Sequence, residues 1–223
     1  MTDSVDEGTG LAQRLLRIDR LESELTRKGA ATLGKSTNLG HADFFLFGAI
    51  RRTLAQARGF RDLIEARNFP CAAAILRLQI DTAMRVNALS LVDDPDATCK
   101  AVLDGEKFNR LKDRDGKKMS DAYLREKLAV SHPWISPIYE RTSDFVHLSG
   151  RHFQVSIART DDVTRIANFQ LSGSDPKRPD ETYFEAVDTF FEATKLAGML
   201  MLAFLMARHQ PEEVSASPAK GTS

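Results

Sequence analysis

Two residues that could cleave RNA lie in the stretch YERTSDFVHLSGRH, residues 139–152. Arg141 and His147 have five residues between them, and Asp144 lies midway. When a ribose 2′-hydroxyl attacks its own phosphate, the reaction needs a base that titrates near neutral pH and a cation beside the phosphorane. Histidine could supply the base and arginine the cation. Arg141 would stabilise the transition state, His147 would move protons, and Asp144 would orient the imidazole.

The same three side chains have a structural interpretation. We expect a helix from Pro137 to about Leu148, in which Arg141 and His147 are about 120° apart around the axis, with Asp144 between them. They could form a surface ionic ladder worth a few tenths of a kcal/mol per pair. A catalytic site would then need a second subunit to complete it.

The spacing of Arg141 and His147 satisfies the R-x4–6-H signature of HEPN domains, and the helical organisation of residues 40–208 also resembles them. Arg125 and His132 fit the same spacing, but His132 precedes Pro133 at an expected helix break. HEPN domains are helical bundles, often dimeric, and many are metal-independent ribonucleases. The resemblance implies a homodimer that acts on RNA and whose biological role is that of a toxin or defence effector.

A cationic connection could supply RNA contacts. Residues 107–118, KFNRLKDRDGKK, carry six cations against Asp113 and Asp115. Lysine and arginine side chains of this kind neutralise phosphates. The alternative is an ordinary solvated loop. The six candidate RNA-binding residues are Lys107, Arg110, Lys112, Arg114, Lys117 and Lys118.

The stretch GAATLGKS, residues 29–36, fits the phosphate-loop pattern G-x-x-x-x-G-K-[ST]. A working phosphate loop follows a buried strand and opens a helix. The preceding residues, LESELTRK, instead indicate the end of a charged helix over 11–28, with Gly29 as its terminating residue. We therefore expect a glycine-rich link between helices, and nucleotide binding stays a third possibility.

A further polar group lies on the helix expected over residues 70–92. Arg77, Asp81 and Arg85 follow i, i+4, i+8 spacing, so they share one face. If buried they must be paired, and if they face a cleft they could bind an anion. Cys71 and Cys99 have no zinc-ligand spacing, and we expect no metal and no cofactor.

Composition and periodicity predict a mainly α protein, a helical bundle with a small β-hairpin inserted before the last long helix. Lysine plus arginine and aspartate plus glutamate are both 31, so the zero net charge gives no DNA-binding footprint. The expected organisation is a disordered tail over 1–10, one helical domain over 11–209 and a disordered tail over 210–223. The expected helices cover residues 11–28, 42–67, 70–92, 95–105, 119–130, 137–148 and 180–209, and the hairpin covers 152–171.

The last helix contains the most apolar run, residues 196–206, which is too short to span a bilayer. The N-terminus has no apolar segment typical of a secretory signal. We therefore expect a cytoplasmic protein without a membrane partner. Besides RNA cleavage, the pattern is compatible with a non-catalytic helical binding or dimerisation module.

Overall fold

The computed structural model describes residues 10–33, 38–175 and 178–210. Nearly all of the two expected tails lies outside these ranges. Within them the chain is a helical bundle with one two-stranded antiparallel hairpin before the final long helix, which confirms the predicted fold class.

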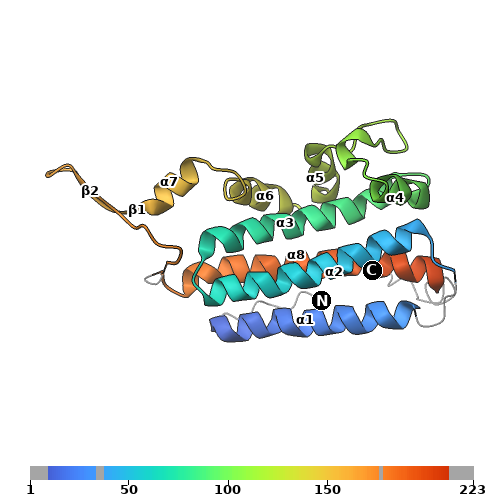
Figure 1. Ribbon diagram of the computed structural model, residues 1–223, viewed down its shortest axis with the longest axis horizontal. Coiled ribbons are helices and arrows are strands. Elements are labelled where there is room, and N and C mark those ends of the chain that lie inside the picture. The colour runs from blue at the N-terminus through green and yellow to red at the C-terminus, as the bar shows by residue number, and fades with distance from the viewer. Residues whose placement is uncertain (1–9, 34–37, 176–177, 211–223) are drawn as a thin grey trace, which may run out of the picture.

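Four long helices form the bundle: α1 (Leu11–Leu33), α2 (His41–Glu65), α3 (Phe69–Asn87) and α8 (Glu181–His209) (Figure 1). α8 packs against each of the other three. The rings of Phe60 and Phe190 stack in the core with centroids 3.9 Å apart, and neither ring is exposed. The apolar faces of four helices are thus buried against one another, as amphipathic helices require.

α2 and α3 form an antiparallel helical hairpin. The link is short because Arg67 adopts a positive φ of 58°, and the side chain of Asn68 accepts a hydrogen bond from Cys71 N. Pro70 in the first turn of α3 cannot donate a backbone hydrogen bond, and at that position none is required. The link therefore ends one helix and starts the next within three residues.

A second layer covers α3 (Figure 1). It contains the 3-10 turns η1 (Ala88–Leu91) and η2 (Phe108–Arg110) and the short helices α4 (Pro95–Leu103), α5 (Asp121–Ala129) and α6 (Ile135–Ser143). α4 starts at a proline, as expected, and Asp94 caps it by accepting from Ala97 N at 3.0 Å. α5 and α6 pack on α3, while α4 packs on α2.

The hairpin starts later than predicted. Residues 150–156 form a short helix, α7 (Gly150–Ser156), and only then follow β1 (Ile157–Asp161) and β2 (Ile166–Phe169). The alternation of Phe153, Val155 and Ile157 had suggested a strand from residue 152. Three apolar residues at a spacing of two are too few to fix a strand when no partner strand lies opposite the first two.

Asp43 connects the start of α2 to the end of α8. Its fully buried carboxylate accepts from Gly40 N at 2.8 Å, from the Arg208 guanidinium at 3.1 and 3.2 Å, and meets His209 Nε2 at 2.7 Å. Asp96 adds a second contact to Arg208 at 3.3 Å. A Cβ on Gly40 would lie 2.4 Å from the Asp96 carboxylate, so any other residue there would displace the Asp96 and Arg208 side chains.

α8 is long and apolar enough to cross a membrane by length and composition alone. In this structure α8 packs against three other helices, and a helix in that position needs apolar residues on several sides. Its central position therefore accounts for its apolar composition. The cytoplasmic location stays a prediction.

Candidate functional site

The segment that carries Arg141 and His147 is less helical than predicted. α6 ends at Ser143, Asp144 is its capping residue, and His147 lies in a bend beyond the helix. The Thr142 and Ser143 hydroxyls donate to carbonyls of the last helical turn at 2.7 and 2.6 Å, and such bonds compete with helix continuation. The predicted helix to about Leu148, and the 120° relation that it implied, are therefore wrong.

Arg141 finds its partner on another helix. Its guanidinium donates to Glu185 of α8 at 2.5 Å, and both side chains are more than half exposed. It also lines a groove of about 140 Å³ beside Phe145, a groove to which His147 does not contribute. Within the described ranges no ion pair links Asp144 to Arg141 or to His147, so neither the ladder nor the oriented imidazole is present in one chain.

The cationic connection lies near the opposite end of α3. Arg114 is a structural residue, because its guanidinium donates to the carbonyls of Ser90 and Val92 at 2.6 and 3.2 Å and holds η1 against the loop. Arg110 faces Glu106 at 3.8 Å. Lys107, Lys112, Lys117 and Lys118 are exposed. Since α3 alone is roughly 28 Å long, the six cations and His147 do not form one surface in a single chain.

The glycine motif is only partly described. Gly29 through Leu33 belong to α1, so Gly29 does not end that helix as predicted. A Cβ at Gly29 would lie 3.4 Å from Ile50 Cδ1, so α1 passes close to α2 at this position. Residues 34–37, including Lys35 and Ser36, lie outside the described ranges. The residues before the motif form a helix, as expected, and not the buried strand of a phosphate loop.

The face of α3 with i, i+4 spacing carries a paired network. Asp81 lies 3.2 Å from Arg85 and 3.7 Å from Arg77, and Arg85 also reaches Asp121 at 3.2 Å. The Arg77 guanidinium stacks on the Tyr139 ring, 3.3 Å from its centroid, and donates to Ser143. The predicted alternative of a paired network inside the fold therefore describes Arg77 and Asp81, whose side chains are only 12% and 13% exposed.

Burial dominates the titration of this network. It raises the pKa of Asp81, although Arg85 and Arg77 act against the rise. It also lowers the pKa of Arg77, which Tyr139 and Asp81 partly offset. Both shifts indicate that the charges are held in a poorly solvated environment, where a further charge would interact strongly.

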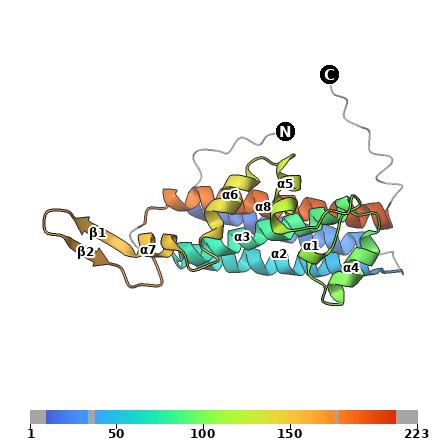
Figure 2. The same cartoon turned by 90° about the horizontal axis from the view of Figure 1, so that it is seen from above.

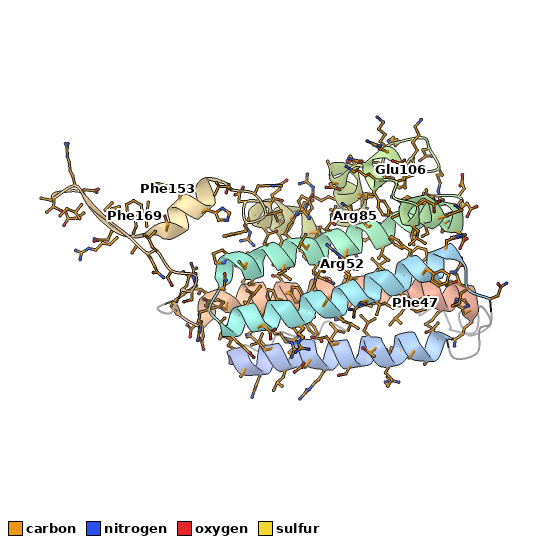
Figure 3. All side chains as sticks on the ribbon, in the orientation of Figure 1. Phe47, Arg52, Arg85, Glu106, Phe153 and Phe169 are labelled. Carbon is orange, nitrogen blue, oxygen red and sulfur yellow. The ribbon has the colours of Figure 1, made fainter. Side chains whose placement is uncertain are left out.

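Beside this network a pocket of about 400 Å³ opens between α2, α3, α4 and η2. Its walls are mainly apolar, and two guanidinium groups and one carboxylate lie among them. Figure 3 shows Arg52 of α2 and Arg85 of α3, which both line this pocket. The apolar lining comes from Phe44, Phe45, Ala49, Val86, Val102, Leu103 and Phe108, and the polar lining from Arg52, Asp81, Thr82 and Arg85.

Arg52 differs from the other lining cation. Arg85 is neutralised by Asp81 and Asp121, whereas Arg52 donates to the Thr82 hydroxyl at 3.1 Å. Among the described residues, no carboxylate oxygen lies within 4.0 Å of the Arg52 guanidinium. The Arg52 guanidinium therefore makes no direct ion pair in the described ranges, although its charge acts on Asp81 and it also donates to the Gln56 amide oxygen at 3.2 Å once that amide is correctly oriented.

The position of Gly48 keeps the pocket open. Gly48 lies in the middle of α2 and lines the pocket, and a Cβ there would meet nothing within 4 Å. Glycine inside a helix costs about 1 kcal/mol relative to alanine. Neither backbone geometry nor packing requires glycine at this position, so the space that it leaves is available to a ligand.

Sequence reasoning missed most of this site. Phe44 is 55% exposed at the pocket, although an aromatic residue of an amphipathic helix is expected to face the core. Phe44, Gly48 and Arg52 share i, i+4, i+8 spacing, and this is the signal that could have identified the face. Arg85 and Asp81 were identified as an anion-binding alternative, but their relation to α2 and α4 depends on tertiary packing.

Comparison of the chain with protein-family models, with curated proteins and with solved structures finds no match. The functional proposal therefore rests on the geometry of the site.

Proposed function

We propose that this protein is a non-catalytic helical binding module whose α2/α3 pocket takes a small organic monoanion with an apolar body. The observation that carries the proposal is the Arg52 guanidinium, which has no carboxylate partner in the described ranges and lies in an apolar-walled pocket. A carboxylate is the natural complement, because guanidinium and carboxylate form two parallel hydrogen bonds. The pocket volume of about 400 Å³ lies in the usual range for small-molecule sites.

The apolar body of the ligand would contact the rim. Phe108 is a buried lining residue of the pocket, and Phe45 packs on it with ring centroids 5.9 Å apart. Phe44 and Leu103 are about half exposed at the opening. An aryl or alkyl group placed between them would remove apolar surface from water on both sides.

Binding can be tested by calorimetry with naphthalene-2-carboxylate and its neutral amide, with dodecanoate as an alkyl probe. The carboxylate should bind at least about 10-fold more tightly than the amide, because a hydrogen bond to a charged group contributes roughly 1.5–3 kcal/mol. Arg52→Gln should remove this difference. Gly48→Leu should abolish binding of both anionic probes, since the leucine side chain would fill the pocket.

Gly59→Leu is the matched control. Gly59 also lies in α2 with open space at its Cβ, but it does not line the pocket. Both leucine variants should remain folded, because leucine is the better helix former. The proposal is wrong if neither anionic probe binds the wild type, or if Gly48→Leu binds them as well as Gly59→Leu does.

The second candidate function is metal-independent RNA cleavage by Arg141 and His147. One observation favours it: both side chains are exposed on the same short segment, where a substrate could reach them. Since one chain does not orient the imidazole through Asp144, this candidate relies on a second subunit to complete the site.

The ribonuclease candidate predicts cleavage of single-stranded RNA in the presence of EDTA. Activity should be lost in Arg141→Ala and in His147→Ala, because each variant removes one of the two required groups. It should be retained in His132→Ala, which changes the histidine of the other R-x4–6-H match. Equal cleavage by the wild type and the Arg141/His147 double variant would assign the activity to a contaminant.

A further inference from the structure

The α2/α3 pocket contains a carboxylate as well as guanidinium groups. It lies between α2, α3, α4 and η2, and α4 is at the opposite end of the bundle from the hairpin in both views (Figures 1 and 2). Asp81 of α3 lines this pocket, and only 13% of its side chain is exposed. A ligand that fills the pocket therefore lies against the Asp81 carboxylate and excludes water from it.

The Asp81 carboxylate has ion-pair partners but receives no directed hydrogen bond from them. Arg85 Nε lies 3.2 Å from one carboxylate oxygen and Arg77 Nη1 lies 3.7 Å from the other, and neither contact has hydrogen-bond geometry. Among the described residues, no other N–H or O–H group donates to this carboxylate. Burial raises the pKa of Asp81, in keeping with this incomplete solvation. Both oxygens therefore keep lone pairs that can accept a hydrogen bond from a ligand.

An apolar ligand surface next to Asp81 would bury the carboxylate without a donor. Removing water from an ionised group that gains no hydrogen bond in return opposes binding. The hydroxyl of the neighbouring Thr82 is already used, since it donates to Leu78 O at 3.0 Å. A ligand that itself donates to Asp81 avoids the cost, and hydrogen bonds to a charged acceptor are stronger than neutral ones.

The charges around the pocket indicate that this donor is a neutral group. The guanidinium groups of Arg52, Arg77 and Arg85 are set against the carboxylates of Asp81 and Asp121, which leaves a single positive charge in excess. One carboxylate on the ligand balances that charge, whereas an additional ammonium group would restore the excess. The donor that fits is therefore a hydroxyl group.

The hydroxyl should lie close to the carboxylate of the ligand. Arg52 donates to the Thr82 hydroxyl at 3.1 Å, and Thr82 directly follows Asp81 in α3. The charge of Arg52 also acts on Asp81, so both groups belong to the same part of the pocket. A ligand carboxylate on Arg52 thus places its nearest carbon atoms beside Asp81, while the apolar body extends toward Phe44 and Leu103 at the opening.

We propose that the ligand of the α2/α3 pocket is a hydroxy acid, whose carboxylate pairs with Arg52 and whose hydroxyl, on a nearby carbon, donates to Asp81. This assignment rests on the proposed function, since it names the class of the same anionic ligand. Asp81 then determines specificity, because it distinguishes a hydroxy acid from the otherwise identical acid that cannot donate.

Calorimetry of the wild type with dodecanoate and its 3-hydroxy and 3-methoxy derivatives tests the assignment. One enantiomer of 3-hydroxydodecanoate should bind roughly 10-fold or more tightly than dodecanoate, because it donates to a charged acceptor. The methoxy derivative has the same oxygen atom but no proton to donate, so it should bind no better than dodecanoate. 12-Hydroxydodecanoate should show no gain either, because its hydroxyl lies at the far end of the chain.

Asp81→Asn tests whether the carboxylate is the acceptor. The variant should bind dodecanoate more tightly than the wild type does, because an amide costs less to bury than a carboxylate. Its preference for the 3-hydroxy acid should fall below about 3-fold. Asp121→Asn is the matched control and should keep the full preference, since Asp121 also lies 3.2 Å from Arg85 but does not line the pocket. Circular dichroism checks the folding of both variants, and the ligand series on the wild type remains decisive if Asp81→Asn does not fold.

Three results would overturn the assignment and leave the proposed function in place. The first is equal binding of dodecanoate and both enantiomers of the 3-hydroxy acid by the wild type. The second is an unchanged preference in folded Asp81→Asn. The third is tight binding of dodecanoate with proton uptake, measured in buffers of different ionisation enthalpy, which would show that a proton neutralises Asp81 instead. If none of these acids and no other anionic probe binds, the proposed function is wrong as well.

Discussion

Replacing Asp43 with alanine should lower the free energy of unfolding by about 3 kcal/mol. The variant leaves Arg208 and His209 without their shared carboxylate at a buried junction, and it removes the side chain that accepts from Gly40 N. Breaking a buried pair on one side costs about 3–5 kcal/mol, and the low end applies because Arg208 is about one-third exposed. Urea unfolding of wild type and variant measures the difference.

The pH dependence of the unfolding free energy shows whether the Asp43 carboxylate is the cause of this loss. Burial would raise the pKa of Asp43, but hydrogen bonds from Arg208, Gly40 N and His209 outweigh it and lower the pKa below its usual 3.8. A lowered pKa means stabilisation that is complete above about pH 4 and is lost as the pH falls through the lowered value. The stability gap between wild type and Asp43→Asn should follow this course.

Asp96→Ala is the control for this prediction. Asp96 also contacts Arg208, but its carboxylate is 37% exposed. Its removal should cost clearly less than the removal of Asp43, because exposed ion pairs contribute little. Equal losses of unfolding free energy in the two variants would show that burial does not increase the contribution of Asp43 to stability.

Replacing Phe190 with alanine should lower the free energy of unfolding by about 4 kcal/mol. Its ring is fully buried and stacks almost parallel on Phe60, with an interplanar angle of 5°. The variant loses the transfer free energy of the ring, creates a cavity and removes the ring contact. For a chain of this size the melting temperature should fall by about 10 °C, which calorimetry measures.

Met199→Ala is the matched substitution on the same helix. Met199 is 61% exposed, so its truncation should change stability by less than about 0.5 kcal/mol. If Met199→Ala lowered stability as much as Phe190→Ala does, the α2/α8 contact around Phe190 would not be the core of the bundle.

Much of the fold follows from periodicity and helix boundaries. The start of α4 at Pro95 and the break around Asn68 depend on local backbone rules, so both were predicted correctly. The end of α6 was wrong because the turn beyond it also depends on contacts with distant residues. Phe145 packs against Phe69 there, 76 residues earlier in the chain.

The candidate site was less predictable than the fold. The i, i+4, i+8 spacing indicated the Arg77, Asp81 and Arg85 face, because helix geometry alone brings these residues together. Arg52 comes from another helix, and only packing of α2 on α3 places it beside them. Arg141 was expected to interact with its own segment, yet its partner Glu185 is 44 residues away.

The place of α8 in the chain has a consequence for biosynthesis. α1, α2 and α3 are made first, and α8, the helix that they all pack against, is translated only after them. Until it emerges, the nascent chain displays apolar stripes that have no cover, and such intermediates are prone to aggregate. We expect translation stalled before Glu181 to leave a product that recruits chaperones, whereas the full chain should escape them quickly.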